Sequence, residues 1–291
     1  MAMFIQGQAM RKKVIVTGAS GFIGKAVVGE FNRRGFEIVP LVRTKKGLSG
    51  EIAIDFCGQD FYNAVYSLPK VDAIVHLGAK IGWTGETVRE LYMPNVVATA
   101  VLANWASRNG AHFIFASAAV VCGAKNRLIS TKSMPNPDTD YGYSKFMAEE
   151  MIKMSGAKYA ILRIGGVFGK DGPKHLGLNR AISEALDGKV PVVNSDGRIK
   201  RNYIFVKDLA AFIASCLEQE IEGTHLVASR NSDTIRSMIE TICRLILVGK
   251  KPEYFENPSG QDQEVVPTSA LTEEHSFEDA IKEIIKDEER A

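Results

Sequence analysis

The stretch KVIVTGASGFIG, residues 13–24, decides the fold class of this chain. It opens with an apolar run typical of a buried strand, and Gly18, Gly21 and Gly24 then lead into a helix-length segment. Glycines at this spacing let the chain turn tightly, let backbone amides approach a pyrophosphate, and let the helix pack close to the strand. The N-terminus of such a helix supplies unpaired N–H groups and the positive end of its dipole. The stretch therefore predicts a strand–turn–helix unit that binds the phosphates of a dinucleotide.

The chain up to residue 165 repeats this alternation of apolar runs and amphipathic segments. The expected strands cover residues 13–18, 37–42, 73–78, 112–117 and 159–164. The expected helices cover residues 22–34, 86–108 and 141–155. Nearly continuous hydrophobicity in the strands indicates that both faces of the sheet are covered. The sequence thus predicts an α/β fold with a doubly wound parallel sheet of the Rossmann type.

The composition of the sequence changes after residue 165, where glycine and proline become frequent in GGVFGKDGPKHLG. We expect a Rossmann domain over residues 11–165, to which residues 201–218 return as a strand and a helix. A small C-terminal substrate-binding lobe is then predicted from residues 166–200 and 219–291. The last segment, SFEDAIKEIIKDEERA, predicts an amphipathic helix capped by Ser276. Residues 1–10 are expected to be a disordered leader outside the fold.

The composition argues against several classes of function. Lys and Arg number 36 against 34 acidic residues, a net charge of +2, which does not support a nucleic-acid-binding surface. The 4 cysteines form no CxxC pair and the 5 histidines are scattered, so neither a metal site nor a disulfide framework is predicted. No apolar run reaches the roughly 18 residues that span a bilayer. We therefore expect a cytoplasmic protein with reduced thiols and no membrane partner.

The end of the second predicted strand bears on the choice of cofactor. An acidic residue there would bind ribose hydroxyls and indicate NAD. The segment EIVPLVRTKKG instead places Arg43 at the strand end, with Lys45 and Lys46 just after it. A cation can pair with a 2′-phosphate, so NADP is favoured over NAD, although a solvated basic loop would look the same.

Several motifs in the same order resemble the extended short-chain dehydrogenase/reductase family, the NAD(P)-dependent epimerase/dehydratase group acting on nucleotide sugars. They are TGASGFIG, IDFCG, VHLGAK, MPNVVAT, YGYSK, LRIGGVFG and SDGRIKRNYIFVKDLA, and together they cover most of the chain. The residues expected to contact the cofactor are Gly18, Gly21, Phe22, Ile23, Gly24, Arg43, Asp55, Phe56, Leu77, Gly78, Ala79, Asn95, Tyr141, Lys145 and Ile164.

YGYSK carries the expected acid–base chemistry. Tyr141 and Lys145 are four residues apart and would share one face of a helix. A free tyrosine ionises near pH 10, and a neighbouring ammonium lowers that pKa by stabilising the phenolate. Tyr141 could then exchange a proton with a substrate hydroxyl while a hydride moves to or from a nicotinamide.

The hydroxyl that normally completes this pair departs from the family pattern. In relatives it stands five residues before the glycine that here is Gly123, and that position is Ala118, whereas Ser117 is at six. Neighbouring strand residues point to opposite faces, so in a regular strand Ala118 faces the nicotinamide and no serine does. A bulge or early turn would bring Ser117 in instead. The sequence leaves both open, and Ser117 is kept as a catalytic candidate.

The substrate side is less well defined. The resemblance implies that Arg201 pairs with a substrate diphosphate, and a guanidinium suits that task. Arg201 could equally form an ion pair with Asp196 or Asp208. Trp83 and Asn179 are further substrate candidates, although Trp83 could also be interlobe core.

These observations predict an NAD(P)-dependent oxidoreductase or epimerase acting on a nucleotide-activated sugar, with 4-keto-sugar reduction slightly preferred because NADP suits net reduction. Ala119 and Val120 stand where relatives that eliminate water carry an acidic pair, which argues against a dehydratase. Reduction of a non-sugar carbonyl and non-catalytic sensing of NADP(H) remain alternatives. The helices near 86–108 and 141–155 occupy positions that pair into a dimer contact in relatives, so we expect a homodimer.

Overall fold

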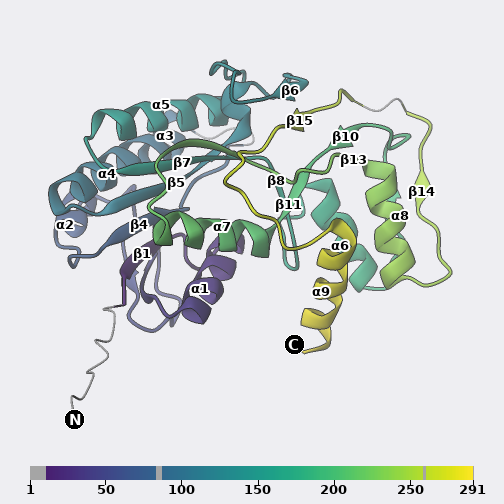
Figure 1. Ribbon diagram of the computed structural model, residues 1–291, viewed down its shortest axis with the longest axis horizontal. Helices are drawn as coiled ribbons and strands as arrows, with labels where there is room; N and C mark the ends of the chain where they lie inside the picture. The colour runs from purple at the N-terminus through teal and green to yellow at the C-terminus, as the bar shows by residue number, and fades with distance from the viewer. Residues whose placement is uncertain (1–10, 83–86, 258–259, 291) are drawn as a thin grey trace, which may run out of the picture.

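A parallel seven-stranded sheet forms the centre of the larger lobe in the computed structural model, which describes residues 11–82, 87–257 and 260–290 (Figure 1). Its strands are β1 (Lys13–Thr17), β2 (Glu37–Val42), β3 (Ile52–Ala53), β4 (Ala73–His76), β5 (His112–Ala118), β7 (Tyr159–Ile164) and β12 (Gly223–Val227). They lie side by side in the order β12-β7-β5-β4-β1-β2-β3. Every neighbouring pair is parallel, which confirms the predicted sheet.

Helices cover both faces of this sheet because the strands are apolar on both sides. Val14 and Val16 pack into one core with α1 (Phe22–Arg34) and α7 (Val206–Glu218). Ile15, between them, packs into a second core on the opposite face. The helices of that second face are α2 (Phe61–Tyr66), α4 (Ala98–Asn109) and α5 (Asp140–Met154). The two helical layers lie on either side of the strands in Figure 1.

The helical segment expected at 86–108 is built from three consecutive pieces. α3 (Val88–Tyr92) runs into a π-helical turn, η1 (Met93–Val97), which continues as α4. Ala98 donates its N–H to the carbonyl of Met93, five residues back, as a π turn requires. Pro94 lies in this turn and has no N–H to donate to a regular helix.

The smaller lobe lies beside the carboxyl end of the sheet (Figure 1). Its helices are α6 (Gly177–Leu186), α8 (Ile235–Ile246) and α9 (Phe277–Glu289). Its short strands pair as β8 (Gly166–Phe168) with β11 (Tyr203–Phe205), β9 (Val192–Val193) with β14 (Glu253–Tyr254), and β10 (Lys200–Arg201) with β13 (Asp233–Thr234). The remaining pair, β6 (Leu128–Ile129) with β15 (Glu264–Val265), joins a loop of the larger lobe to the C-terminal part of the chain.

The predicted lobe boundaries need one correction. Residues 219–291 were assigned to the small lobe, but β12 lies within them and pairs with β7 at the edge of the main sheet. Of the expected return segment 201–218, the helix α7 packs beside α1, where Arg34 bridges to Glu218 at 2.6 Å. Its strand does not join the main sheet, because β11 pairs with β8. Ser276 caps α9 through its hydroxyl, as predicted. The leader at residues 1–10 lies outside the described residues.

Candidate functional site

The turn between β1 and α1 has a backbone geometry that glycine alone satisfies without strain. Gly18 adopts a φ of 67°, and a Cβ there would lie 3.0 Å from the backbone nitrogen of Gly78. A Cβ on Gly24 would lie 2.1 Å from the carbonyl oxygen of Gly18. The turn therefore excludes side chains at Gly18 and Gly24, and the absence of a side chain is what close approach of a backbone to a phosphate requires.

The first turn of α1 fits the phosphates of a dinucleotide. Gly21 is the N-cap residue, no side chain caps the helix, and the first turn carries no acidic residue. The N–H groups of Phe22, Ile23 and Gly24 have no intrahelical partner and lie at the positive end of the helix dipole. These are the groups that would hold a pyrophosphate.

The other residues predicted to line the cofactor stand along one edge, where the neighbouring strands end. They are Arg43 after β2, Asp55 and Phe56 after β3, Leu77, Gly78 and Ala79 after β4, and Ile164 at the end of β7. Asp55 accepts a hydrogen bond from the Cys57 N–H at 3.0 Å, and the Phe56 ring packs edge-on against His76 at 6.0 Å between centroids. Arg43 is exposed. The parallel strands thus place these positions along one edge of the sheet, and their contact with a cofactor stays a prediction.

A buried histidine joins the ends of β1 and β4. The Thr17 hydroxyl oxygen accepts hydrogen bonds from the N–H groups of Leu77 (3.1 Å) and Gly78 (3.0 Å) and lies 2.7 Å from Nδ1 of His76. Because both lone pairs of Thr17 are used, its hydroxyl donates to Nδ1, and Nε2–H of His76 donates to Thr99 at 3.0 Å. Burial, with the nearby positive charge of Lys145, lowers the pKa of His76 to about 3, so the ring is neutral.

The same chain of hydrogen bonds continues to α5, the helix that carries Tyr141 and Lys145. Thr99 donates to the carbonyl of Asn95 at 2.7 Å. The Asn95 side chain accepts from the N–H of Lys80 (2.7 Å), donates to the Lys80 carbonyl (2.8 Å) and donates to the Ser144 hydroxyl (3.0 Å). Ser144 in turn donates to the carbonyl of Tyr141 at 2.8 Å. An unbroken set of contacts therefore runs from Thr17, which precedes the glycine turn, to the first turn of α5.

Tyr141 and Lys145 lie on α5 at this edge, one turn apart. The Lys145 ammonium donates to the carbonyl of Ala116 on β5 at 2.8 Å and lies 4.6 Å from the centroid of the Phe115 ring. It is 5.8 Å from the centroid of the Tyr141 ring. The helix is held in this orientation by Thr139, whose hydroxyl accepts from the N–H of Gly142. The structure brings the predicted proton-transfer pair together.

Burial shifts the pKa of both groups away from their ordinary values. It lowers the pKa of Lys145 to about 7, while the negative charge of Glu149 acts in the opposite direction. It raises the pKa of Tyr141 to about 12. At neutral pH Tyr141 therefore keeps its proton, and Lys145 is close to the midpoint of its titration.

Ser117 points to the side of the sheet covered by α5. Its hydroxyl donates to Glu149, which is fully buried and is bonded to Arg163 Nη2 at 2.7 Å. β5 stays regular to its last residue, where Ala118 pairs with Ile164 of β7. This is the regular arrangement, in which Ala118 and not Ser117 stands at the position of the usual hydroxyl.

Arg201 is held by backbone carbonyls. Its Nη1 donates to the carbonyls of Lys200 and Gln261, each at 2.8 Å. Within the described part of the chain it pairs with no carboxylate, and Asp208 is bonded instead to His275 at 2.7 Å. The alternative of an ion pair with Asp196 or Asp208 is thus not what the structure shows.

The other two substrate candidates are Asn179 and Trp83. Asn179 is buried on α6, accepts from the Gly169 N–H at 3.2 Å and donates to the Val167 carbonyl at 3.0 Å. These bonds tie down the loop after β8, so the predicted substrate contact gives way to a structural role. Trp83 lies outside the described residues.

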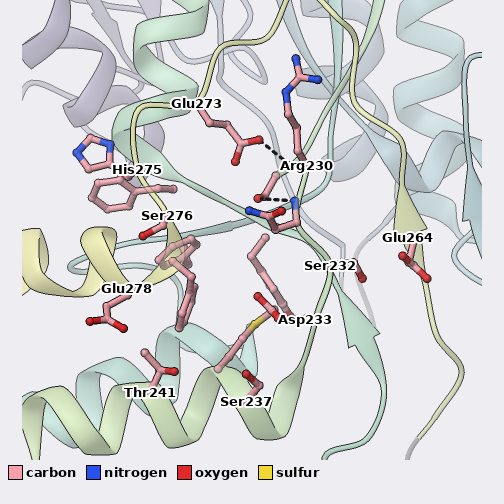
Figure 2. A pocket seen from close by; sticks show the side chains of 17 residues that line it. Arg230, Ser232, Asp233, Ser237, Thr241, Glu264, Glu273, His275, Ser276 and Glu278 are labelled. Atoms are coloured by element: carbon pink, nitrogen blue, oxygen red, sulfur yellow. Dashed lines mark hydrogen bonds between the residues drawn. The ribbon is translucent and has the colours of Figure 1, made fainter.

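A cavity of about 580 Å³ opens in the small lobe (Figure 2). It lies between β11, α8 and the start of α9, and none of the residues predicted for the cofactor or substrate lines it. Figure 2 shows Glu273 beside Arg230, where the carboxylate accepts the backbone N–H of Arg230 at 2.6 Å. The Arg230 guanidinium donates to the carbonyls of Ser269 and Leu271. Arg230, the arginine in the lining of this cavity, is therefore already bound by the protein's own backbone carbonyls.

The described ranges of the chain contain neither a metal cluster nor a membrane-spanning helix. No group of three or more His, Cys, Asp or Glu residues there could hold a metal ion. Cys57, Cys122, Cys216 and Cys243 are free thiols. No helix of those ranges is both long and apolar enough to cross a membrane.

Three buried polar residues of the site were not singled out from the sequence. His76 and Arg163 each interrupt an otherwise apolar strand, AIVH and YAILRI, and Glu149 follows Lys145 by four residues. A charged residue inside a buried run must find a partner, and an i, i+4 spacing places two residues on one helix face. Both signals were present in the sequence.

Comparisons with known proteins agree with this geometry. The family described as "NAD dependent epimerase/dehydratase family" matches residues 14–228. A UDP-glucose 4-epimerase of Neisseria meningitidis serogroup B is 27% identical over 276 residues, which cover 79% of this chain and 80% of that protein.

Solved structures share the fold over nearly the whole chain. UDP-N-acetylglucosamine 4-epimerase from Bacillus cereus has a TM-score of 0.80 at 23% identity and covers 94% of this chain and 98% of its own. MoeE5, solved in complex with UDP-glucose and NAD, has a TM-score of 0.79 at 22% identity and covers 96% and 99%.

We predict that Lys145→Met stabilises the protein at pH 6 by about 2 kcal/mol, because it removes an ammonium whose burial is costly. In wild type the Lys145 pKa is about 7 folded and 10.5 unfolded, so between these values the unfolded state binds more protons and wild-type stability rises with pH. The advantage of the variant therefore shrinks toward pH 10. Urea unfolding at a series of pH values measures it. A variant less stable than wild type at pH 6, or a difference independent of pH, contradicts the prediction.

Proposed function

The chain belongs to the NAD-dependent epimerase/dehydratase family of extended short-chain dehydrogenases/reductases and is an enzyme, and on that premise we propose that it transfers a hydride between a pyridine dinucleotide and a nucleotide-activated sugar. One observation carries the proposal. Tyr141 and Lys145 lie on α5 at the same sheet edge as the glycine turn, and buried hydrogen bonds from Thr17 to Ser144 connect the two.

In the proposed reaction the residues of this chain handle the proton and the charge. The nicotinamide ring supplies or accepts the hydride when the cofactor is bound. Tyr141, protonated at neutral pH, donates its proton to the oxygen of a carbonyl as that oxygen gains negative charge. Lys145, when protonated, stabilises the phenolate that remains. In the oxidation direction the same two groups act in reverse.

Net reduction of a 4-keto sugar is the preferred form of this activity. A tyrosine that keeps its proton is ready to act as an acid, and Arg43 at the end of β2 suits the 2′-phosphate of NADP(H). Arg43 forms no hydrogen bond or ion pair with any described residue, so its guanidinium is available. NAD is the alternative cofactor, named with the MoeE5 structure.

Epimerisation is the second candidate, supported by the named activity of the Neisseria meningitidis relative. An epimerase returns the hydride to the same sugar and consumes no cofactor overall. The two candidates therefore differ in stoichiometry.

For the substrate, Arg201 is the proposed contact to a diphosphate. Its Nη1 is fixed by two carbonyls, whereas Nε and Nη2 make no hydrogen bond to the described residues. The two carbonyls thus fix the orientation of the guanidinium, and its Nε–Nη2 edge stays available for two phosphate oxygens. Ser117 has no part in the proposed substrate contacts, because its hydroxyl is committed to Glu149.

We predict that the protein oxidises NADPH in the presence of a nucleotide-diphosphate 4-keto sugar, one cofactor per sugar. Tyr141→Phe should lower kcat at least about 100-fold because the proton donor is lost. Ser117→Ala should keep kcat within about threefold, because the Ser117 hydroxyl is bonded to Glu149 and stabilises no developing charge on the substrate. Absorbance at the nicotinamide band measures all three proteins.

Conversion between sugar epimers without net cofactor oxidation would support the epimerase instead. Full activity in Tyr141→Phe, or loss of activity in Ser117→Ala comparable to that of Tyr141→Phe, contradicts the assignment of roles.

The second prediction of this proposal concerns cofactor choice. Arg43→Ala should raise the KM for NADPH about tenfold and leave the KM for NADH unchanged, since only NADPH carries the 2′-phosphate. Lys153→Ala, which removes an exposed cation on α5 paired with Glu150, serves as the control. Equal effects of Arg43→Ala on both cofactors, or a wild type that uses NADH alone, rule out the role given to Arg43.

We also propose a homodimer through α3, η1, α4 and α5. α5 exposes Tyr143 (49%), Met147 (42%) and Met154 (78%), and α3 exposes Val88 (75%), so apolar side chains face solvent along these helices. Spacings of four and seven residues put Tyr143, Met147 and Met154 on one face of α5. A second copy of the chain is the occupant that would bury this stripe.

Met147→Glu is expected to shift the protein from dimer to monomer at micromolar concentration, because it places a charge in the centre of the proposed contact. Sedimentation velocity measures the change, with Lys153→Glu as the control on the same helix. A monomeric wild type contradicts the proposal.

A further inference from the structure

A buried carboxylate lies one helical turn beyond Lys145. Glu149 is fully buried, as Lys145 nearly is, and it accepts a hydrogen bond from the hydroxyl of Ser117. Arg163 donates to the same carboxylate through Nε at 3.1 and 3.2 Å and through Nη2 at 2.7 Å. Nη1 of Arg163 donates to the thiol of Cys122 at 3.5 Å. The carboxylate therefore accepts hydrogen bonds from side chains of both β5 and β7.

This cluster is poorly explained as a stabilising device. Burying an ion pair costs desolvation that the attraction between its members often fails to offset, and apolar residues of the same size commonly serve stability as well or better. Ser117 and Arg163 follow Phe115 and Ile161 by two residues and so lie on the same face of the sheet, where Phe115 and Ile161 belong to an apolar core. A second role for the charge is therefore worth seeking.

The charged and titratable groups around Lys145 come from three elements. α5 contributes Tyr141 and Glu149, β4 contributes His76, which is neutral, and β7 contributes Arg163. β5 contributes only a carbonyl and an aromatic ring. Among the described residues that face Lys145, Glu149 is the one source of negative charge, and Arg163 lies beyond it.

We propose that Glu149 is a positioning residue that keeps Lys145 protonated beside Tyr141, and that Ser117 and Arg163 hold the Glu149 carboxylate in place for this purpose. The catalytic part of this inference rests on the proposed function, whereas the electrostatic part stands without it. It also assigns Ser117 a role: its hydroxyl orients the carboxylate instead of the substrate.

The direction of the effect follows from the sign of the charge. A neighbouring carboxylate favours the ammonium form of Lys145 and disfavours the phenolate form of Tyr141. Removing the carboxylate therefore lowers the pKa of both groups. An apparent pKa that reports on either group must therefore also fall.

The test measures the Lys145 pKa in the protein without cofactor, by NMR of ¹³C-labelled lysine side chains. The signal of Lys145 is assigned by its absence in Lys145→Met. Glu149→Gln should lower this pKa by about one pH unit. The matched control is Glu150→Gln, which removes the next acidic residue of α5, partly exposed and paired with Lys153, and should leave the Lys145 pKa unchanged.

Glu149→Gln leaves Arg163 buried without a counterion and is at risk of unfolding. The double variant E149Q/R163M removes both charges and avoids that risk. It should also lower the Lys145 pKa, by less than the single variant, because the nearer charge dominates. An unchanged Lys145 pKa in whichever of these two variants folds overturns the inference, as does an equal shift in Glu150→Gln.

The pH dependence of kcat/KM gives the second readout. Under the proposed function, the apparent pKa of the catalytic pair moves down in the Glu149 variants by the same amount as in the NMR titration. A shift seen by NMR but absent from the kinetic profile supports the electrostatic role of Glu149 and contradicts the catalytic role of the pair. The failure of one proposal is thus separated from the failure of the other.

Discussion

A chain of buried hydrogen bonds fixes the geometry on which this protein depends. It runs from Thr17 at the end of β1 through His76 of β4 and Thr99 of α4 to Asn95 in the π turn, and it ends at Ser144 on α5. Each member is buried, so a broken link would leave a polar group without water or partner. The neutral state of His76 is part of this constraint, since its two nitrogens must accept on one side and donate on the other.

The consequence is that the end of β1, where the glycine turn begins, and α5 are tied into one arrangement by buried hydrogen bonds. The turn carries the N-terminus of α1, which no side chain caps, and α5 carries Tyr141 at the same edge of the sheet. Lys145 is anchored to β5 through the Ala116 carbonyl, at the cost of burying an ammonium. A buried charge of this kind is common at functional sites, where an ionisable group is often kept at some cost to the stability of the fold.

Much of this arrangement could be predicted from the sequence, because the strands are apolar runs with turn signals between them and the glycine spacing has a clear physical meaning. The strands at 37–42 and 159–164 and the helix at 22–34 appear with the predicted bounds. β12 was missed because GTHLV is short and mixed in polarity, as an edge strand can be. Its place in the sheet depends on pairing with β7, a contact that no local pattern announces.

The side chains of the site were harder to predict than its backbone. The direction of Ser117 depends on whether β5 stays regular, and only the ladder to β7 shows that it does. Asn179 was a substrate candidate, but its side-chain amide is hydrogen-bonded to the backbone at Val167 and Gly169. Glu149 and Arg163 were overlooked because glutamate and arginine are common residues that usually lie at the surface. These two stand out only because they are buried as a pair.

If a pyridine dinucleotide binds along the carboxyl edge of the sheet, calorimetric titration of the wild-type protein with NADPH and, separately, with NADH must detect it. We expect saturable binding of at least one of the two, with one site per chain. Absence of a binding heat for both cofactors at concentrations up to about 1 mM would contradict it.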